Sequence, residues 1–356
     1  MKVKRFITTG LSVLMFISML TSASAGSTEM PTDPIGGQPP AGSKPSVKDL
    51  DYQVKYQRAF EAVIWGIPAV GIYGFEKGIR GLGLKDNVIL AFSAPAKQNS
   101  ELLTANTVTP YIVGFTDLRN GPAVLELPSA SKNASLYGQI VDHWQFSIAD
   151  VGPSGIDKGM GGKILLTPPG YSEKIPEGYL HVKSPSYKVN FAFRSIPGTN
   201  SNAARAYQYS QTLNIYYLSE LPNPKPTHIV DPLDMRFSTL PPYDETYFDD
   251  LHQIFSVEHA NPRDKVMTGM LASLGIEKGK SYNPDAKTKK AMRAAAVDAF
   301  FYLKEKYVEG VPDEIFYEER QWRWTLYPDT NMGYSWETDA LVDTNNRALH
   351  FYHWAT

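Results

Sequence analysis

The chain has 356 residues, with 35 basic and 37 acidic side chains interspersed along it and a formal net charge of −2. This balance argues against a nucleic-acid-binding protein, which would present a basic face to the phosphates. Cysteine is absent, which excludes a disulfide framework and thiolate metal ligands, so the fold must rely on a packed core.

The first 25 residues have the pattern of a cleavable secretory signal peptide. Lys2, Lys4 and Arg5 form a positive region, residues 10–20 are apolar, and small residues follow up to Ala25. The apolar stretch is shorter than the roughly 20 residues of a membrane-spanning helix. No later segment is long and apolar enough to span a membrane. We therefore expect a mature protein that is periplasmic or secreted and has no membrane span.

Residues 26–45 are rich in Pro, Gly, Ser and Thr, and this composition predicts a flexible linker. A helix is expected next, because Ser46 can cap its first turn and Asp49 suits the N-terminal end of the helix dipole. Apolar residues then recur at helical spacing up to Val63. Gly66 and Pro68 predict the end of this helix.

Short strands are predicted between residues 123 and 194, separated by turns rich in Gly and Pro. The clearest strand lies at 187–194, where a period of two indicates one face in the core and one in water. The core face is expected to hold Tyr187, Val189, Phe191 and Phe193, and the wet face Lys188, Asn190 and Arg194. The other predicted strands lie at 123–127, 136–141, 163–167 and 179–183.

After Gly198 the apolar pattern returns to helical spacing. Its predicted stripe consists of Ala206, Tyr209, Leu213 and Tyr216. Two later Asn-Pro pairs, at 261–262 and 283–284, each place a capping side chain before a proline suited to the first helical turn. The predicted class is α+β: an antiparallel β-sandwich or jelly-roll-like domain at 46–198 with a flanking N-terminal helix, then a helical segment at 199–310.

The last segment, 311–356, is rich in Trp and Tyr and ends in a predicted helix at about 337–354. The apolar side chains of this helix are Leu341, Leu349, Phe351, Tyr352 and Trp354. Large exposed apolar faces on soluble proteins are typical of contact surfaces. We expect a homodimer through this helix, or aggregation, unless the helix folds back onto the sheet domain.

The densest polar cluster lies around His143. An imidazole beside carboxylates could act as a general base that one of them orients. Adjacent residues on a strand point to opposite faces, so Asp142 cannot orient His143. The better partner is Asp150 or Asp157, because the glycine-rich loop could place either carboxylate near His143. The alternative is a histidine at a strand end that caps a loop.

Other sites of known chemistry find little support. The glycine-rich run at 155–163 departs from a phosphate-binding loop, because Asp157 replaces its first glycine and Ile164 its magnesium-binding Ser or Thr. The sequence contains neither a G-x-S-x-G elbow nor the HExxH spacing of a zinc site. Asp150 and Asp157 would be the oxygen ligands if calcium bound here. We predict no metal and no cofactor.

Several stretches resemble the bacterial domain of unknown function 1254. They are residues 56–68 with Trp65-Gly-Ile-Pro68, 107–117 with Thr109-Pro110-Tyr111, 121–128, and 141–170 with Asp142-His143-Trp144 and Gly161-Gly162-Lys163. Together they span roughly residues 50–195 and are specific as a set. Residues 292–352 resemble only the start of a second, strand-rich domain numbered 1214, so 311–356 is expected to be its truncated beginning. The resemblance implies an exported, largely β protein, and it transfers no catalytic residue.

Two functions follow from these features, and the sequence leaves open whether the protein is an enzyme. The leading hypothesis is binding of a small polar or carbohydrate-like ligand between sheet and helices, because the chain has a polar, aromatic-rimmed region but no recognised nucleophile. The ligand-binding candidates are Tyr111, Trp144 and Arg194. The alternative is a hydrolase with the catalytic candidates His143, Asp150 and Asp157.

Overall fold

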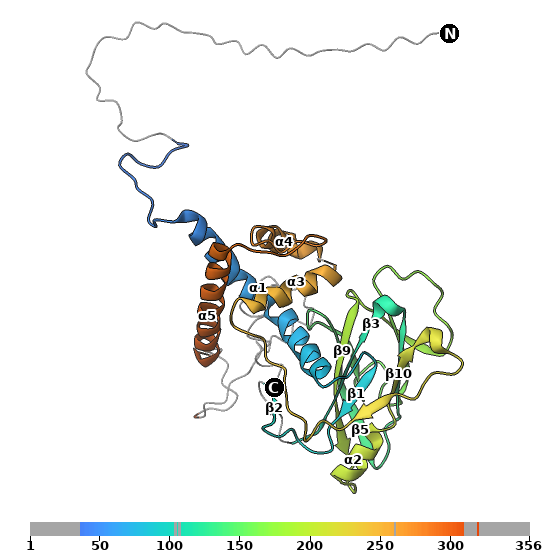
Figure 1. Ribbon diagram of the computed structural model, residues 1–356. Helices are drawn as coiled ribbons and strands as arrows, with labels where there is room; N and C mark the ends of the chain where they lie inside the picture. Colours follow the sequence, from blue (N-terminus) through green and yellow to red (C-terminus); the bar gives the residue numbers. More distant parts are fainter. Residues whose placement is uncertain (1–35, 103–104, 106–107, 260, 310–318, 320–356) are drawn as a thin grey trace, which may run out of the picture. The chain divides into compact units, whose positions relative to one another are not determined.

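A computed structural model describes residues 36–102, 105, 108–259, 261–309 and 319 of the chain (Figure 1). The chain divides into two units, Met1–Lys48 and Asp49–Thr356. In the first unit, residues 36–48 contain bends and turns. The predicted signal peptide and the helix expected at 337–354 lie outside the described residues. In the described part of the chain, no helix has the length and hydropathy that a membrane span needs.

Helix α1 spans Leu50–Gly81, and its cap is Asp49, whose side chain accepts a hydrogen bond from the backbone N–H of Tyr52 at 3.0 Å. The prediction of Ser46 as the cap was therefore wrong, as was the prediction that the helix ends at Pro68. Residues 62–71 are all buried. Tertiary packing around this segment outweighs the cost of a proline within a helix.

A glycine of α1 allows a neighbouring strand to approach closely. A Cβ atom added at Gly78 would lie 2.2 Å from the backbone oxygen of Ser238. Gly78→Ala should therefore lower the free energy of unfolding by about 1–3 kcal/mol through displaced backbone. Gly81→Ala is the control, because no atom lies within 4 Å of its added Cβ. Urea unfolding of both variants would contradict this account if Gly78→Ala were as stable as the control.

The strands form two main sheets and a small one, and most neighbouring strands are antiparallel (Figure 1). In the described residues the larger sheet has the order β11-β1-β3-β9-β5-β6, and the smaller has the order β10-β4-β7-β8. Strands β2 and β12 pair separately. The bounds are β1 Val88–Ala91, β2 Ser100–Glu101, β3 Tyr111–Asp117, β4 Ala123–Leu127, β5 Ala134–Asp142, β6 Ser147–Val151, β7 Gly162–Thr167, β8 Tyr179–Lys183, β9 Lys188–Pro197, β10 Asn214–Tyr217, β11 His228–Val230 and β12 Phe237–Ser238.

One hydrophobic core lies between the two sheets, which confirms the predicted α+β class with a sandwich-like pair of sheets. Phe191 and Phe193 of β9 pack in this core with Ile164 and Leu166 of β7. Phe191 is 2% exposed, as its alternation predicted. The prediction of a wet opposite face was wrong, because Lys188 and Asn190 are also buried. Helix α1 packs over that face, where its Ile79 joins Val113 and Phe115 of β3.

The remaining helices are α2 Ala203–Ser210, α3 Thr246–Val257, α4 Lys265–Ala272 and α5 Ala286–Glu309, with short 3-10 helices at Leu118–Asn120, Leu218–Glu220 and Pro262–Asp264. The prediction that a helical stripe continues to Tyr216 was wrong, because Asn214–Tyr217 is strand β10, which pairs with β4. Helix α5 begins after Asp285, whose carboxylate accepts from the N–H of Thr288 at 2.7 Å, and not at the Asn-Pro pair. Helices α3, α4 and α5 share a second core with the first half of α1.

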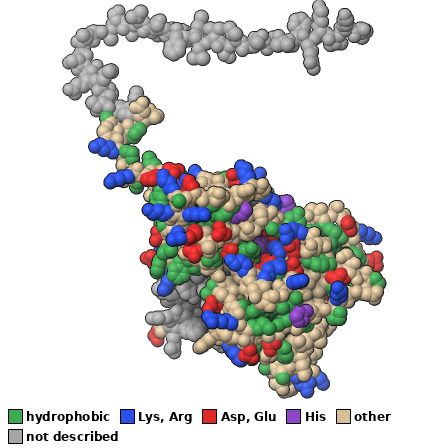
Figure 2. Space-filling model, in the orientation of Figure 1, with side chains coloured by type: hydrophobic (Ala, Val, Ile, Leu, Met, Phe, Trp, Pro, Cys, Tyr) green, Lys and Arg blue, Asp and Glu red, His purple; other side chains and the backbone are tan. Residues whose placement is uncertain are grey.

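Figure 2 shows acidic and basic side chains interspersed over the face in view. Helix α5 leaves two large apolar side chains exposed, Val297 at 41% and Phe301 at 59%. The domain boundaries drawn from the sequence stay predictions. Strands from both sides of residue 198 nevertheless share the sheets, since β10 and β11 join strands that precede it.

Candidate functional site

The face of the larger sheet that turns toward α1 carries side chains in cross-strand rows. Strand β9 lies between β3 and β5, so each inward residue of β9 has a neighbour on both sides. Arg194 lies opposite Tyr111 of β3 and Tyr137 of β5. Directly opposite residues have Cβ atoms about 5 Å apart. The Arg194 guanidinium carbon lies 5.5 Å from the centre of the Tyr111 ring, a cation–π arrangement.

The next row has a small residue at its centre. Ala192 lies opposite Val113 and Gln139. The Gln139 side chain reaches the edge of the sheet, where its Nε2 donates to the carboxylate of Asp150 at 2.8 Å. The row therefore runs from an apolar side on β3 to a polar, exposed side on β6. The short side chain of Ala192 leaves space above the middle of the sheet.

The third row is almost entirely apolar except for Asn190, which lies opposite Phe115 and Val141. Asn190 is 6% exposed, and its Nδ2 is a buried donor with no hydrogen-bond partner among the described residues. Most buried polar groups in folded proteins are hydrogen-bonded, so an unsatisfied donor requires an explanation.

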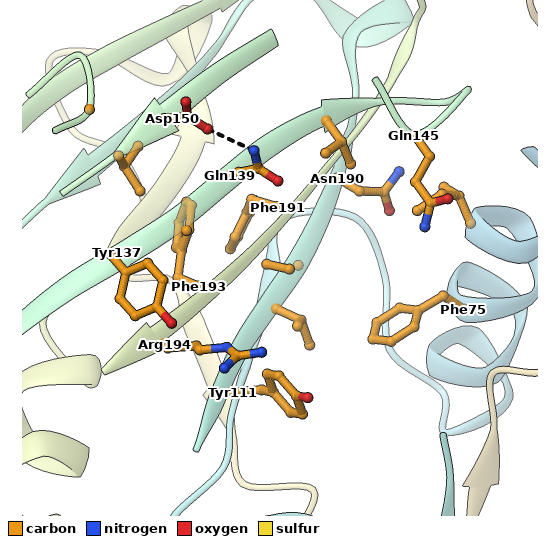
Figure 3. A pocket seen from close by; sticks show the side chains of 18 of the residues that line it. Phe75, Tyr111, Tyr137, Gln139, Gln145, Asp150, Asn190, Phe191, Phe193 and Arg194 are labelled. Atoms are coloured by element: carbon orange, nitrogen blue, oxygen red, sulfur yellow. Dashed lines mark hydrogen bonds between the residues drawn. The ribbon is translucent and has the colours of Figure 1, made fainter. Parts of the chain in front are cut away.

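A cavity of about 830 Å³ opens over these rows (Figure 3). The sheet lines one side of the cavity. Helix α1 lines it with Ile72 and Phe75, and the segment after β12 with Thr239 and Leu240. Figure 3 shows Arg194 with Tyr111 toward one end of the cavity, and Asn190 with Gln145 toward the other. Its size lies within the range of small-molecule sites.

Gln145 occupies an unusual backbone conformation in the hairpin turn between β5 and β6. Its φ is +63°, in the left-handed region that residues with a Cβ atom seldom adopt. The turn is held by Asp142, whose carboxylate accepts from the N–H groups of Trp144 and Phe146 at 2.8 and 2.9 Å. The Gln145 side chain lines the cavity. Outliers of this kind cluster at ligand-binding and active sites.

The structure places the six residues proposed from the sequence in different surroundings. Tyr111, Arg194 and Asp150 line the cavity. Trp144 lies instead in the helical core, with its ring 4.9 Å from that of Trp65. Asp157 holds the glycine-rich loop, because its carboxylate accepts from the N–H groups of Gly152 and Gly161.

His143 is not among the residues that line the cavity. It is 1% exposed, and burial lowers the pKa of its imidazole to about 4. Neither ring nitrogen has a hydrogen-bond partner within the described ranges. Its ring centre is 6.4 Å from that of Tyr73. His143 is therefore neutral near pH 7 and is not oriented by Asp150 or Asp157.

A buried ionic network continues the pattern of rows beyond Asn190. Lys188 donates to Glu76 of α1 at 2.8 Å and forms a 3.2 Å ion pair with Asp117, which it faces on β3. Burial opposes ionisation of Asp117, but hydrogen bonds from Arg119 and the charge of Lys188 lower its pKa to about 2. Nearby, burial raises the pKa of Glu258 to about 7, although its carboxylate accepts two backbone N–H bonds. This network joins α1 to the sheet next to the cavity.

Gln139, Gln145 and Asn190 carry no motif in the sequence. Gln145 lies in the polar cluster around His143, and Asn190 lies on the same period-two face as Arg194. Nothing in the strand shows that a helix covers this face. The polar inner end of the cavity is therefore visible only in the folded chain.

Comparisons with known proteins bear on the fold. No curated protein matches the chain. The crystal structure of the VPA0106 protein from Vibrio parahaemolyticus superposes with a TM-score of 0.51 at 18% sequence identity. The superposition covers 70% of this chain and 59% of that one, so it shows a shared fold. The resemblance to domain 1214 stays a prediction. Residues 87–217 match the family described as "Protein of unknown function (DUF1254)", which supports the resemblance to domain 1254.

Proposed function

We propose that the protein binds a small organic molecule in the cavity between the larger sheet and α1. The observation that carries this proposal is the arrangement of a few polar groups on mainly apolar walls. Ile72, Phe75 and Val113 supply apolar surface, while Arg194 and Asn190 supply hydrogen-bond donors. Small-molecule sites combine these two features, because apolar burial gives affinity and a few polar groups fix orientation. The apolar walls favour a less hydroxylated ligand than a sugar.

The geometry favours binding over hydrolysis. A general base must come within hydrogen-bond reach of the proton it removes. His143 is buried outside the cavity lining, and burial holds its pKa well below neutrality. Asp150 lies at the exposed side of the cavity, where it accepts from Gln139. We therefore assign Tyr111, Arg194, Gln139 and Asp150 to ligand contact.

A fluorescent probe tests the cavity as a binding site. Anilinonaphthalene sulfonate combines aromatic rings with an anionic group, and its emission rises in apolar surroundings. We expect saturable binding to the wild-type protein and its loss in Ala192→Trp, whose indole would fill the middle of the cavity. Ala204→Trp is the matched control, because Ala204 is exposed on α2. Circular dichroism is the check that both variants fold. Equal probe binding by all three folded proteins would contradict the proposal.

We also propose that the protein is exported and works in the periplasm or outside the cell. The positive, apolar and small residues of 1–25 support this proposal. Intact-mass measurement of exported protein should find a chain that begins at Gly26. A chain that still carried residues 1–25 would contradict it. The homodimer through residues 337–354 rests on sequence alone.

A further inference from the structure

The unsatisfied amide of Asn190 points to a ligand with an oxygen at the inner end of the cavity. Asn190 is 6% exposed, its Nδ2 has no partner in the described part of the chain, and it lines the cavity. A buried donor without a partner destabilises the free protein, whereas an apolar residue of the same shape would not. The flanking Phe115 and Val141 show that an apolar side chain suits this row.

Gln145 adds a second polar group at the same end. Val141 pairs with Asn190, and the hairpin turn that contains Gln145 follows directly after β5. The turn places a glutamine at φ +63°, where glycine or asparagine is the common choice. Because its side chain lines the cavity, this costly conformation presents an amide to the interior. Figure 3 shows both amides toward this end.

The opposite end of the cavity holds the cationic side chain of Arg194. Arg194 lies between Tyr111 and Tyr137, and its guanidinium stacks on the Tyr111 ring at 5.5 Å. A guanidinium is always charged, and its planar fork of N–H donors matches a carboxylate. Arg194 and Asn190 are four residues apart on one strand, so their Cα atoms are separated by about 13 Å. Ala192 lies between them on β9, opposite Val113 of β3, and Phe75 of α1 lines the same cavity.

We propose that the cavity binds an elongated organic acid that carries a second oxygen at its far end. The carboxylate pairs with Arg194, the apolar body lies over Ala192, and the far oxygen accepts a hydrogen bond from Asn190. This inference rests on the proposed binding function and names the ligand class. Asn190 would then determine specificity, because an acid without the far oxygen leaves its amide unsatisfied.

Three probes with the same ten-carbon chain separate the contributions of Arg194 and Asn190: decanoate, ω-hydroxydecanoate and decanol. Calorimetric titration of the wild-type protein should give about tenfold tighter binding of ω-hydroxydecanoate than of decanoate, since only the former satisfies the Asn190 donor. Decanol should bind more weakly than either acid, because it lacks the carboxylate for Arg194. If neither acid binds the wild-type protein, the ligand class is wrong. The fluorescent probe and Ala192→Trp then decide separately whether the cavity binds ligands at all.

Asn190→Leu keeps the size of the side chain and removes its donor. We expect the preference for ω-hydroxydecanoate over decanoate to disappear. In the absence of ligand, the melting temperature should rise, because an unsatisfied buried amide has been replaced by an apolar group. Asn223→Leu, at an exposed position, is the control and should change neither property. A retained preference, or a lower melting temperature in the folded variant, would overturn the role of Asn190.

Arg194→Met tests the other end of the ligand. Loss of a charge-assisted pair should weaken binding of both acids by about 10–100-fold and leave decanol binding unchanged. The preference for ω-hydroxydecanoate should persist, because Asn190 is intact. Arg205→Met is the control, since Arg205 is exposed on α2. An equal loss for decanol and the acids would show that Arg194 shapes the cavity without binding a carboxylate, and would overturn the assignment.

Discussion

Lys188→Met should lower the free energy of unfolding by about 3 kcal/mol, because it removes the cation that binds two buried carboxylates. The side chains of Glu76 and Asp117 are only 3% and 4% exposed, and Lys188 lies within 3.2 Å of both. Arg80 and Arg119 each bind one of these carboxylates from more exposed positions. Without Lys188, Glu76 of α1 and Asp117 of β3 would lie close together, and Arg80 and Arg119 would neutralise their negative charges only in part.

The pH dependence of this loss identifies its cause. Burial acts to raise the pKa of Glu76, but Lys188 and Arg80 together hold it below the usual 4.5. A carboxyl group whose pKa is lower in the folded state stabilises the protein at pH values above its pKa in the unfolded state. This stabilisation is lost as the pH falls through the pKa of the folded state. The difference in the free energy of unfolding between wild type and Lys188→Met should therefore become smaller as the pH falls below about 4.5.

Lys163→Met is the matched control for Lys188→Met. Lys163 pairs with Glu126 at 3.0 Å, but the two side chains are 50% and 29% exposed. Exposed pairs contribute about 0–1 kcal/mol. Urea unfolding at pH 7 measures both variants. Equal losses of stability in the two variants would show that the Lys188 network contributes no more than a surface ion pair.

Phe191→Ala should cost about 3–5 kcal/mol of unfolding free energy, the usual result of truncating a buried aromatic side chain. Phe191 is 2% exposed in the core between the sheets, where its ring stacks on Phe193 with centres 5.0 Å apart. Sheet strands on both sides of β9 fix its neighbours, so the space left by the ring cannot collapse without moving backbone. Lost burial and the remaining cavity both contribute to this cost.

Phe301→Ala is the control for Phe191→Ala, because it removes the same atoms from a side chain that is 59% exposed on α5. We expect Phe301→Ala to change the free energy of unfolding by less than about 1 kcal/mol. Chemical denaturation monitored by circular dichroism gives both values. A loss below about 1 kcal/mol in Phe191→Ala would mean that the sandwich core does not depend on this face of β9.

The sequence alone determined those elements whose signal is local. Short runs between turns rich in Gly and Pro predicted strands β4, β7 and β8. Alternation of apolar residues predicted β9, because successive side chains on a strand point to opposite faces. The same alternation placed Phe191 in the core. The polar cluster around His143 drew attention to Asp150, and the sequence also proposed Tyr111 and Arg194 as ligand-binding residues. All three line the cavity. Each of these inferences uses residues only a few positions apart.

Only the tertiary structure decided what covers each face and where each element ends. Helix α1 continues through Pro68 because residues 62–71 are buried on all sides by distant parts of the chain. Tyr216 belongs to a strand because β4 offers it a hydrogen-bonding edge. The face of β9 with Lys188 and Asn190 looks polar along the chain, yet α1 packs over it. Local pattern shows that two faces differ, but burial depends on contacts between residues more than a hundred positions apart, as between Glu76 and Lys188.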